Sequence, residues 1–153
     1  MDIYRYLKQD HETVNQMMEK MPSVPAAKRG QAFDNIKKEL TLHAESEEQT
    51  FYEAVKKAAR TKSAEEKVEH ANEEHDEIRE YLDKLSAMNY KTEEWLMCFG
   101  EFKHAVTHHV EEEESEMFEK AKRYLSPEQA KSLVAEMDAL KEEMEATLEK
   151  KAA

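Results

Sequence analysis

Apolar residues recur along this chain at alternating spacings of three and four, which is the period of one face of an α-helix. Prolines and capping residues divide the pattern into helical segments at residues 3–20, 25–60, 64–87, 92–123 and 127–149. The short connections favour antiparallel neighbours. The sequence therefore predicts an all-α fold: an up-and-down antiparallel four-helix bundle in residues 1–124, with an additional C-terminal helix in residues 125–153.

Capping residues indicate where these helices begin. Ser63, with Glu66 three residues later, predicts a capping box at the start of the third segment. Ser126 and Pro127, followed by Gln129, predict another at the start of the fifth. Thr92 is the expected N-cap of the fourth segment, and Pro25 suits the first turn of the second.

The apolar stripe of each of the first four segments is interrupted near its middle. The interrupting residues are His11 in the first segment, His43 and Glu47 in the second, His75 in the third, and His109 and Glu113 in the fourth. Burying four imidazoles and two carboxylates at one level of a core costs on the order of several kcal/mol for each uncompensated charge. A metal ion removes that cost, because the ligands then direct their lone pairs at a cation. The pattern therefore predicts a metal site built from these six side chains.

Other polar residues near these positions fall off the inward stripes. Glu45, Glu48, His108, Glu111, Glu112 and Glu114 are expected on a solvated face, and His104 on the surface. Tyr4 lies two turns before His11, so it is a candidate neighbour of the site, with a plain core aromatic as the alternative.

Charge and composition narrow the range of partners. The net charge of −12 argues against nucleic acid and anionic membranes and favours cations. No apolar run approaches the roughly 20 residues that span a bilayer, and the N-terminal sequence has no secretory pattern. A single cysteine, Cys98, suits a reducing compartment. We therefore expect a soluble, cytoplasmic protein without a membrane partner.

Four short motifs, taken together, resemble the hemerythrin-like family, whose domain is also called the HHE cation-binding domain. In chain order they are QDHETV around His11, HAESEEQTFY from His43, EEHDEI around His75 and HHVEEEESEMF from His108, within residues 3–120. The resemblance implies two iron ions joined by an oxo or hydroxo bridge. It also implies terminal ligands at His11, His43, His75 and His109, and bridging carboxylates at Glu47 and Glu113.

The ligand inventory agrees with such a centre. Two six-coordinate ions need about twelve donor positions, and the six side chains supply about eight. The remainder leaves room for a bridging oxygen and for a small ligand such as O2, NO or peroxide. Nitrogen and oxygen donors without thiolate suit iron, and manganese is the alternative metal.

The chain departs from the oxygen-carrying members of the family at one ligand. Those proteins have a second histidine one turn before the residue that matches His75, and Ala71 stands there in this chain. His70 is adjacent but turned by about 100° on a regular helix. His108 lies five residues before Glu113, a spacing that the oxygen carriers use. His70 and His108 are therefore the alternative ligands.

The absent donor points away from reversible O2 transport and towards bacterial relatives linked to oxidative and nitrosative stress. Three functions follow. The first is a di-iron protein that binds or reacts with a small oxidant, as sensor, scavenger or store. The second is an enzyme-like stress protein that turns over peroxide or NO, or delivers iron for iron–sulfur repair. The third is a metal-free helical scaffold.

The fifth segment has no inward histidine or acid. Its apolar stripe consists of Leu133, Met137, Leu140, Met144 and Leu148. This stripe predicts either a helix that packs on the bundle or a surface for self-association. The sequence is therefore compatible with both a monomer and a homodimer.

Overall fold

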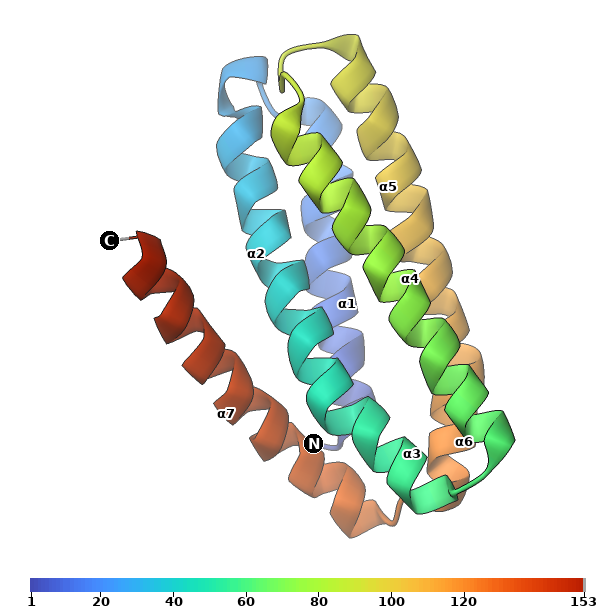
Figure 1. The fold of residues 1–153 in the computed structure, drawn as a ribbon. Helices are drawn as coiled ribbons and strands as arrows, with labels where there is room; N and C mark the ends of the chain where they lie inside the picture. Colours follow the sequence, from blue (N-terminus) through green and yellow to red (C-terminus); the bar gives the residue numbers. More distant parts are fainter. Residues whose placement is uncertain (153) are drawn as a thin grey trace.

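Four long antiparallel helical rods form a bundle in the computed structural model, which describes residues 1–152, and a further helix lies against it (Figure 1). The helices are α1 (Ile3–Lys20), α2 (Arg29–Glu47), α3 (Glu53–Ala59), α4 (Lys62–Ala87), α5 (Glu93–Glu112), α6 (Phe118–Tyr124) and α7 (Pro127–Ala152). Short 3-10 turns at Met21–Ser23 and Ala26–Lys28 connect α1 to α2. Residues 1–152 contain no strand, and the predicted all-α bundle with a C-terminal helix is confirmed. The last residue of the predicted segment 125–153 lies outside the described residues.

Two of the predicted helices are continuous rods that each contain one wider turn. A π-helical turn at Glu48–Tyr52 joins α2 to α3, and another at Glu113–Met117 joins α5 to α6. A π-helical turn holds one residue more than an α-helical turn, so it moves the inward face of the helix along by one position. One wider turn directly follows Glu47 and the other begins at Glu113, and the sequence predicts both glutamates as ligands.

The helix starts follow the capping signals except at Pro25 and Ser63. Pro25 precedes the 3-10 turn Ala26–Lys28 instead of lying in the first turn of α2, which begins at Arg29. The Thr92 hydroxyl accepts the Trp95 N–H at 3.1 Å, and Ser126 and Gln129 bond reciprocally at 2.8 and 3.1 Å. The prediction for Ser63 is wrong. Arg60 ends α3 in the left-handed conformation, and the extended Thr61 then becomes the N-cap of α4, accepting the Ala64 N–H at 3.2 Å.

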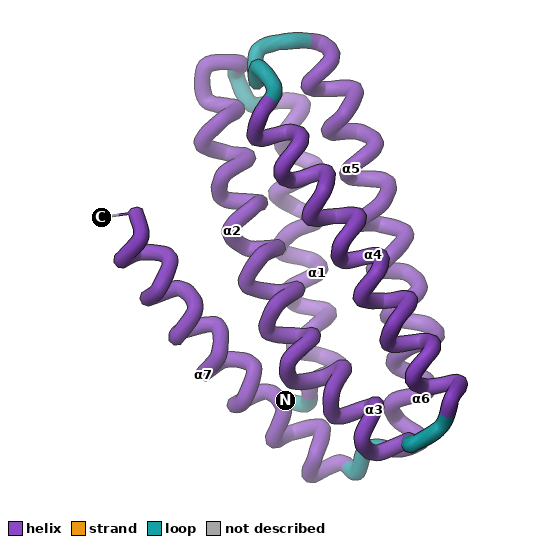
Figure 2. Tube along the Cα trace, in the orientation of Figure 1, coloured by secondary structure: helices purple, strands orange, loops and turns teal. Residues whose placement is uncertain are grey.

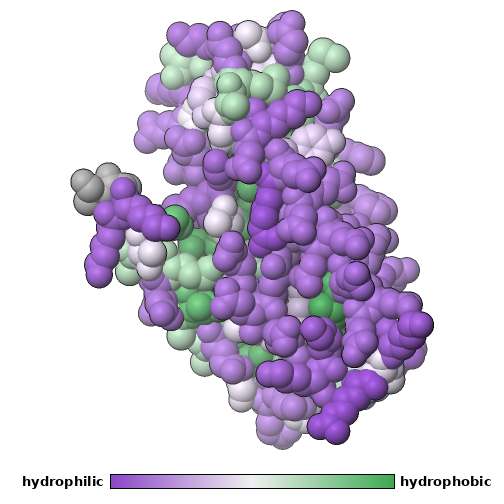
Figure 3. Space-filling model, viewed as in Figure 1, coloured by the Kyte–Doolittle hydropathy of each residue, from purple (hydrophilic) through white to green (hydrophobic). Residues whose placement is uncertain are grey.

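The four rods follow one another around the bundle axis in the order α1, α2, α4 and α5, with α5 returning to α1 (Figure 2). The first half of α7 packs on α1 and α2 and buries Ala130, Leu133 and Met137. Its second half diverges from the bundle (Figure 1), and Leu148 is exposed. Hydrophobic residues appear at the surface in the angle between α7 and the bundle (Figure 3). Self-association through this helix stays a prediction.

The hydrophobic core has two parts. One includes Leu7, Phe51 and Phe118 together with the buried residues of α7, and the other includes Phe33, Trp95 and Phe102. The bundle interior also contains buried histidine and glutamate side chains, in addition to the residues of these two clusters. Within residues 1–152, no helix combines the length and the apolar character that spanning a membrane requires.

Candidate metal centre

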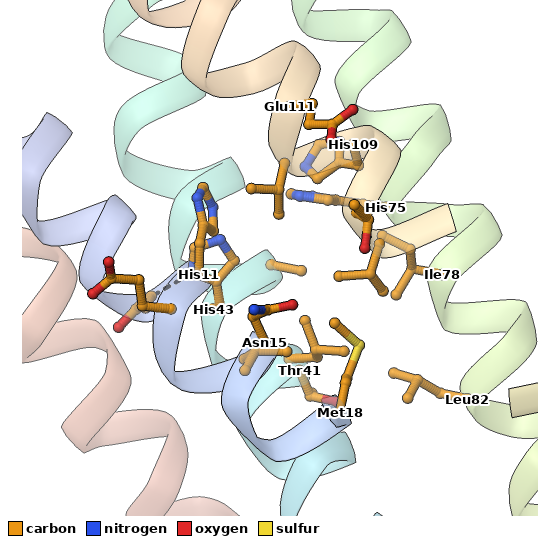
Figure 4. A pocket seen from close by; sticks show the side chains of 18 of the residues that line it. His11, Asn15, Met18, Thr41, His43, His75, Ile78, Leu82, His109 and Glu111 are labelled. Atoms are coloured by element: carbon orange, nitrogen blue, oxygen red, sulfur yellow. Dashed lines mark hydrogen bonds and ion pairs between the residues drawn. The ribbon is translucent and has the colours of Figure 1, made fainter. Parts of the chain in front are cut away.

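Polar side chains are rare in the interior of this bundle. Those buried within the described residues are His11, His43, Ser46, Glu47, His75, His109 and Glu113. Ser46 donates to the Leu42 carbonyl oxygen at 2.6 Å, so its hydroxyl is satisfied within its own helix. The other six are the residues predicted as ligands. The four histidines come from four different helices and turn towards a common interior region (Figure 4).

These six side chains form two groups of potential metal donors. One group contains His11, His43, Glu47 and Glu113, and the other contains Glu47, His75, His109 and Glu113. In each group the donor atoms lie within 4.8 Å of one another. Both carboxylates belong to both groups, so the arrangement offers two neighbouring cation positions that share two acidic side chains.

The inward-facing ring nitrogens lie at distances that suit a shared metal ion. The Nε2 to carboxylate oxygen separations are 3.3 Å for His11–Glu113, 3.4 Å for His43–Glu47, 3.2 Å for His75–Glu47 and 3.4 Å for His109–Glu113. Bonds of about 2.1 Å meeting at angles between about 90° and 109° place two donors about 3.0–3.4 Å apart. The Nε2 atoms of His11, His43 and His109 and both oxygens of Glu47 are buried without a hydrogen-bond partner. Unpartnered donors at these separations fit metal coordination better than a hydrogen-bonded core.

The outward ring nitrogens form a closed series of hydrogen bonds around the bundle. Each Nδ1 bonds a carboxylate of the neighbouring rod: His43 to Asp10 at 2.8 Å, His75 to Glu48 at 2.7 Å, His109 to Glu74 at 2.9 Å and His11 to Glu114 at 2.7 Å. Each of these carboxylates is also the chain neighbour of one of the six inner residues. Bonds of this kind fix the ring orientation and leave Nε2 free to bind a cation.

The predictions for Glu48 and Glu114 are therefore wrong, because both partly buried side chains contact a histidine of the site instead of solvent alone. Glu48 lies at the start of a π-helical turn and Glu114 within one. The sequence signal that could have found the outer carboxylates is their position, since each directly precedes or follows an inner residue. Lys141 of α7 pairs with Asp10 and so connects the C-terminal helix to this series.

Tyr52 reaches the site through the first π-helical turn. Its hydroxyl donates to Glu113 Oε2 at 2.5 Å and lies 3.4 Å from His75 Nε2. Tyr52 is not among the predicted site residues, because a regular helix would direct Phe51 inward in its place. Tyr4 packs its ring against Phe51 and Phe118, and its buried hydroxyl has no hydrogen-bond partner among the described residues.

Burial and close charges change the pKa values of these groups. Burial lowers the pKa of His43, but Glu47 and Asp10 overcome this effect and raise it to about 10. Burial likewise lowers the pKa of His109, and Glu113 and Glu74 raise it to about 10. Burial raises the pKa of Glu113, yet its contacts with Glu47, His109 and His11 hold it well below the ordinary value. The Glu113 carboxylate therefore stays ionised and requires positive charge nearby, which protonated imidazoles or bound cations can supply.

The two alternative histidines lie outside the central groups. The side chains of His70 and His108 are 52% and 59% exposed. Both face Glu74 and Glu112 on the outer surface of α4 and α5. His104 is also exposed, as expected.

An apolar cavity of about 270 Å³ adjoins the four histidines. Its lining includes Val14, Met18, Leu40, Ile78, Leu82 and Val106 in addition to the imidazole rings (Figure 4). Such a lining admits small apolar molecules and disfavours bulk water. The cavity therefore provides space beside the donors for a small ligand.

Comparisons with known proteins agree with this geometry. A family model described as "Hemerythrin HHE cation binding domain" matches residues 2–121. A DNA nickase from Nostoc sp. (strain PCC 7120 / SAG 25.82 / UTEX 2576) is 29% identical over 149 residues, which are 97% of this chain but only 41% of that protein's length. The crystal structure of a Hemerythrin HHE cation binding domain-containing protein from Mycobacterium kansasii matches with a TM-score of 0.83 at 21% identity, covering 96% of this chain and 89% of that one. At this identity the structural match establishes the fold alone.

Proposed function

This chain belongs to the hemerythrin HHE cation-binding domain family, and from this premise we propose that it holds two iron ions and reacts with a small oxidant, O2, NO or peroxide. The observation that carries the proposal is the pair of buried donor groups that share Glu47 and Glu113. The six side chains of these groups could hold two cations, and imidazole with carboxylate donors suits iron, with manganese as the alternative.

In this proposal the side chains have separate roles. When bound, iron would supply electrons and coordination positions for the oxidant. The outer carboxylates orient the imidazoles, and Glu47 and Glu113 neutralise the two cations together. The Tyr52 hydroxyl holds one oxygen of Glu113 by a hydrogen bond and can provide a proton beside the centre. The apolar cavity admits a small uncharged oxidant to the imidazole side of the site.

Anaerobic reconstitution tests the metal proposal directly. We expect purified protein to bind about two ferrous ions per chain, because two donor groups are present, and to keep them during gel filtration. Metal analysis by inductively coupled plasma spectrometry measures this number. Protein that retains no iron would favour the metal-free scaffold instead.

The reaction with oxidants is a separate test. The ferrous protein is mixed with O2, NO and hydrogen peroxide in parallel, and near-ultraviolet absorption follows the formation of an oxidised di-iron pair. We expect oxidation without a stable, reversible O2 adduct, because Ala71 supplies no ligand. A lasting adduct that releases O2 under vacuum would contradict this expectation. Many peroxide turnovers per site would instead favour the second function, an enzyme-like stress protein.

The outer hydrogen bonds carry a further prediction. Asp10→Ala removes the acceptor of His43 Nδ1 and should weaken binding of one ion by about 10- to 100-fold. Titration of the metal-free protein with Mn²⁺, followed by electron paramagnetic resonance, measures the two affinities. Glu19→Ala, an exposed acid on the same helix, is the matched control. Equal affinities for the two variants would remove Asp10 from the proposed mechanism.

We do not extend the nickase activity of the Nostoc relative to this chain. The match covers 41% of that protein, and a net charge of −12 opposes binding to a phosphate backbone. A reducing compartment such as the cytoplasm remains our proposal for its location, supported by a single, buried, unpaired Cys98.

A further inference from the structure

A third group of potential metal donors lies on the outer surface where α4 and α5 meet. It consists of His70, Glu74 and Glu112, which are exposed or half-buried. His70 Nε2 lies 3.5 Å from Glu74 Oε2 and 3.3 Å from Glu112 Oε2. Two donor atoms bound to one metal ion are about 3.0–3.4 Å apart, and the distances in this group are similar. His108 Nε2 is 3.7 Å from each of the same two oxygens and provides a fourth donor within reach.

Two carboxylates placed side by side need a cation between them. Glu112 Oε2 is shielded from solvent and accepts no hydrogen bond in the described structure. The neighbouring Lys67 does not fill this role, because its ammonium group pairs with Glu116. Protonated histidines could neutralise the carboxylates in a simple surface ion pair, so a metal and a proton are the two competing cations.

A small cavity borders both this surface group and the central site. Its volume is about 10 Å³, close to the space that one water molecule needs. His70, Glu74 and Glu112 line it, and so do His109 and Glu113. The latter two are almost fully buried, and His109 Nε2 and Glu113 Oε1 have no hydrogen-bond partner. The wall of the cavity therefore includes residues of the surface group and residues of the central site.

Glu74 belongs to both sites. Its Oε1 accepts a hydrogen bond from His109 Nδ1 at 2.9 Å, whereas its Oε2 faces His70 and His108. Ala71, one turn before His75, also lines the cavity and contributes only a methyl group to its wall. A larger side chain at this position would fill the space between the surface and the centre.

We propose that His70, Glu74 and Glu112, assisted by His108, bind a divalent transition-metal ion at the surface and pass it inward to the central site. Imidazole and carboxylate donors suit Fe²⁺ and Mn²⁺. The binding of an ion at the surface stands by itself, and its delivery to the centre rests on the proposed function.

Surface binding is tested with Mn²⁺ in a Glu47→Ala background, where central binding is weakened. We expect one Mn²⁺ per chain by electron paramagnetic resonance, with an affinity that falls at least about tenfold when His70→Ala and His108→Ala are added. His104→Ala, another exposed histidine of α5, is the matched control and should change nothing. The absence of this ion would overturn the proposal and leave only a surface ion pair.

Delivery is tested in the otherwise unchanged protein by the rate at which chelator-resistant Fe²⁺ accumulates without oxygen. The His70→Ala/His108→Ala variant should fill about tenfold more slowly and still reach two ions per chain. Ala71→Val should also fill slowly while it keeps the surface ion, because the added methyl groups narrow the cavity. Unchanged rates in both variants would overturn the delivery role. If the unchanged protein never holds two irons, the proposed function fails, and the Mn²⁺ measurement still decides the surface site.

Discussion

Glu47→Ala is expected to release both metal ions, whereas His43→Ala should release one. Glu47 belongs to both donor groups, and its Oε1 faces His43 at 3.4 Å and His75 at 3.2 Å. Its loss takes a donor from each ion and also removes half of the carboxylate charge between them. We expect the apparent affinity for each ion to fall by at least about 100-fold, beyond the effect of losing an outer hydrogen bond.

The measurement is metal content after dialysis against a chelator, with circular dichroism to verify that the helices remain. Glu39→Ala, an exposed glutamate of the same helix, is the control and should keep two ions. Glu47→Gln maintains the shape of the side chain and tests the charge alone, because an amide is a weak ligand for iron. Two ions retained in Glu47→Ala would mean that this carboxylate bridges nothing.

His109→Ala should lose the ion of its own donor group, and His108→Ala should retain full metal content. The two residues are adjacent in sequence, but the His109 side chain is 5% exposed and that of His108 is 59% exposed. His109 Nδ1 is held by Glu74, so its Nε2 is oriented towards Glu113 before any metal binds. We expect the affinity of the affected site to fall by at least about 100-fold in His109→Ala.

Thermal unfolding provides a second measurement for the same pair. A ligand that binds only the folded protein raises its stability in proportion to the logarithm of its affinity, by about 2.7 kcal/mol at 100 times the dissociation constant. Added Fe²⁺ should therefore raise the melting temperature of His108→Ala by several degrees more than that of His109→Ala. The opposite order would mean that the inward face of α5 is misassigned.

The six inner residues were predictable because helical periodicity is local. An inward histidine followed one turn later by an inward glutamate needs only the α-helical period to be recognised. Periodicity also placed His109 inward and His108 outward, and the structure places both there. Assigning these residues as metal ligands remains a proposal that the variants above will test.

The predictions from sequence were wrong or incomplete where the helical period changes, and where the end of the preceding helix determines the N-cap. Tyr52 was not predicted because the π-helical turn moves the inward face of the helix by one residue. The helix propensities of the residues in this turn do not predict it. Ser63 has the composition of a cap, but Arg60 ends α3 in the left-handed conformation, so Thr61 becomes the N-cap and α4 begins at Lys62.

The sequence by itself determined the number of continuous helical rods, their inward faces and the level at which polar donors enter the core, since each depends on spacing within one rod. The tertiary structure alone decided which carboxylate orients which imidazole. Glu114 and His11 are far apart in the chain, and their bond forms only because α5 returns to lie beside α1. A pairing between helices depends on how the rods are rotated and ordered around the bundle, and packing of the whole core sets that arrangement.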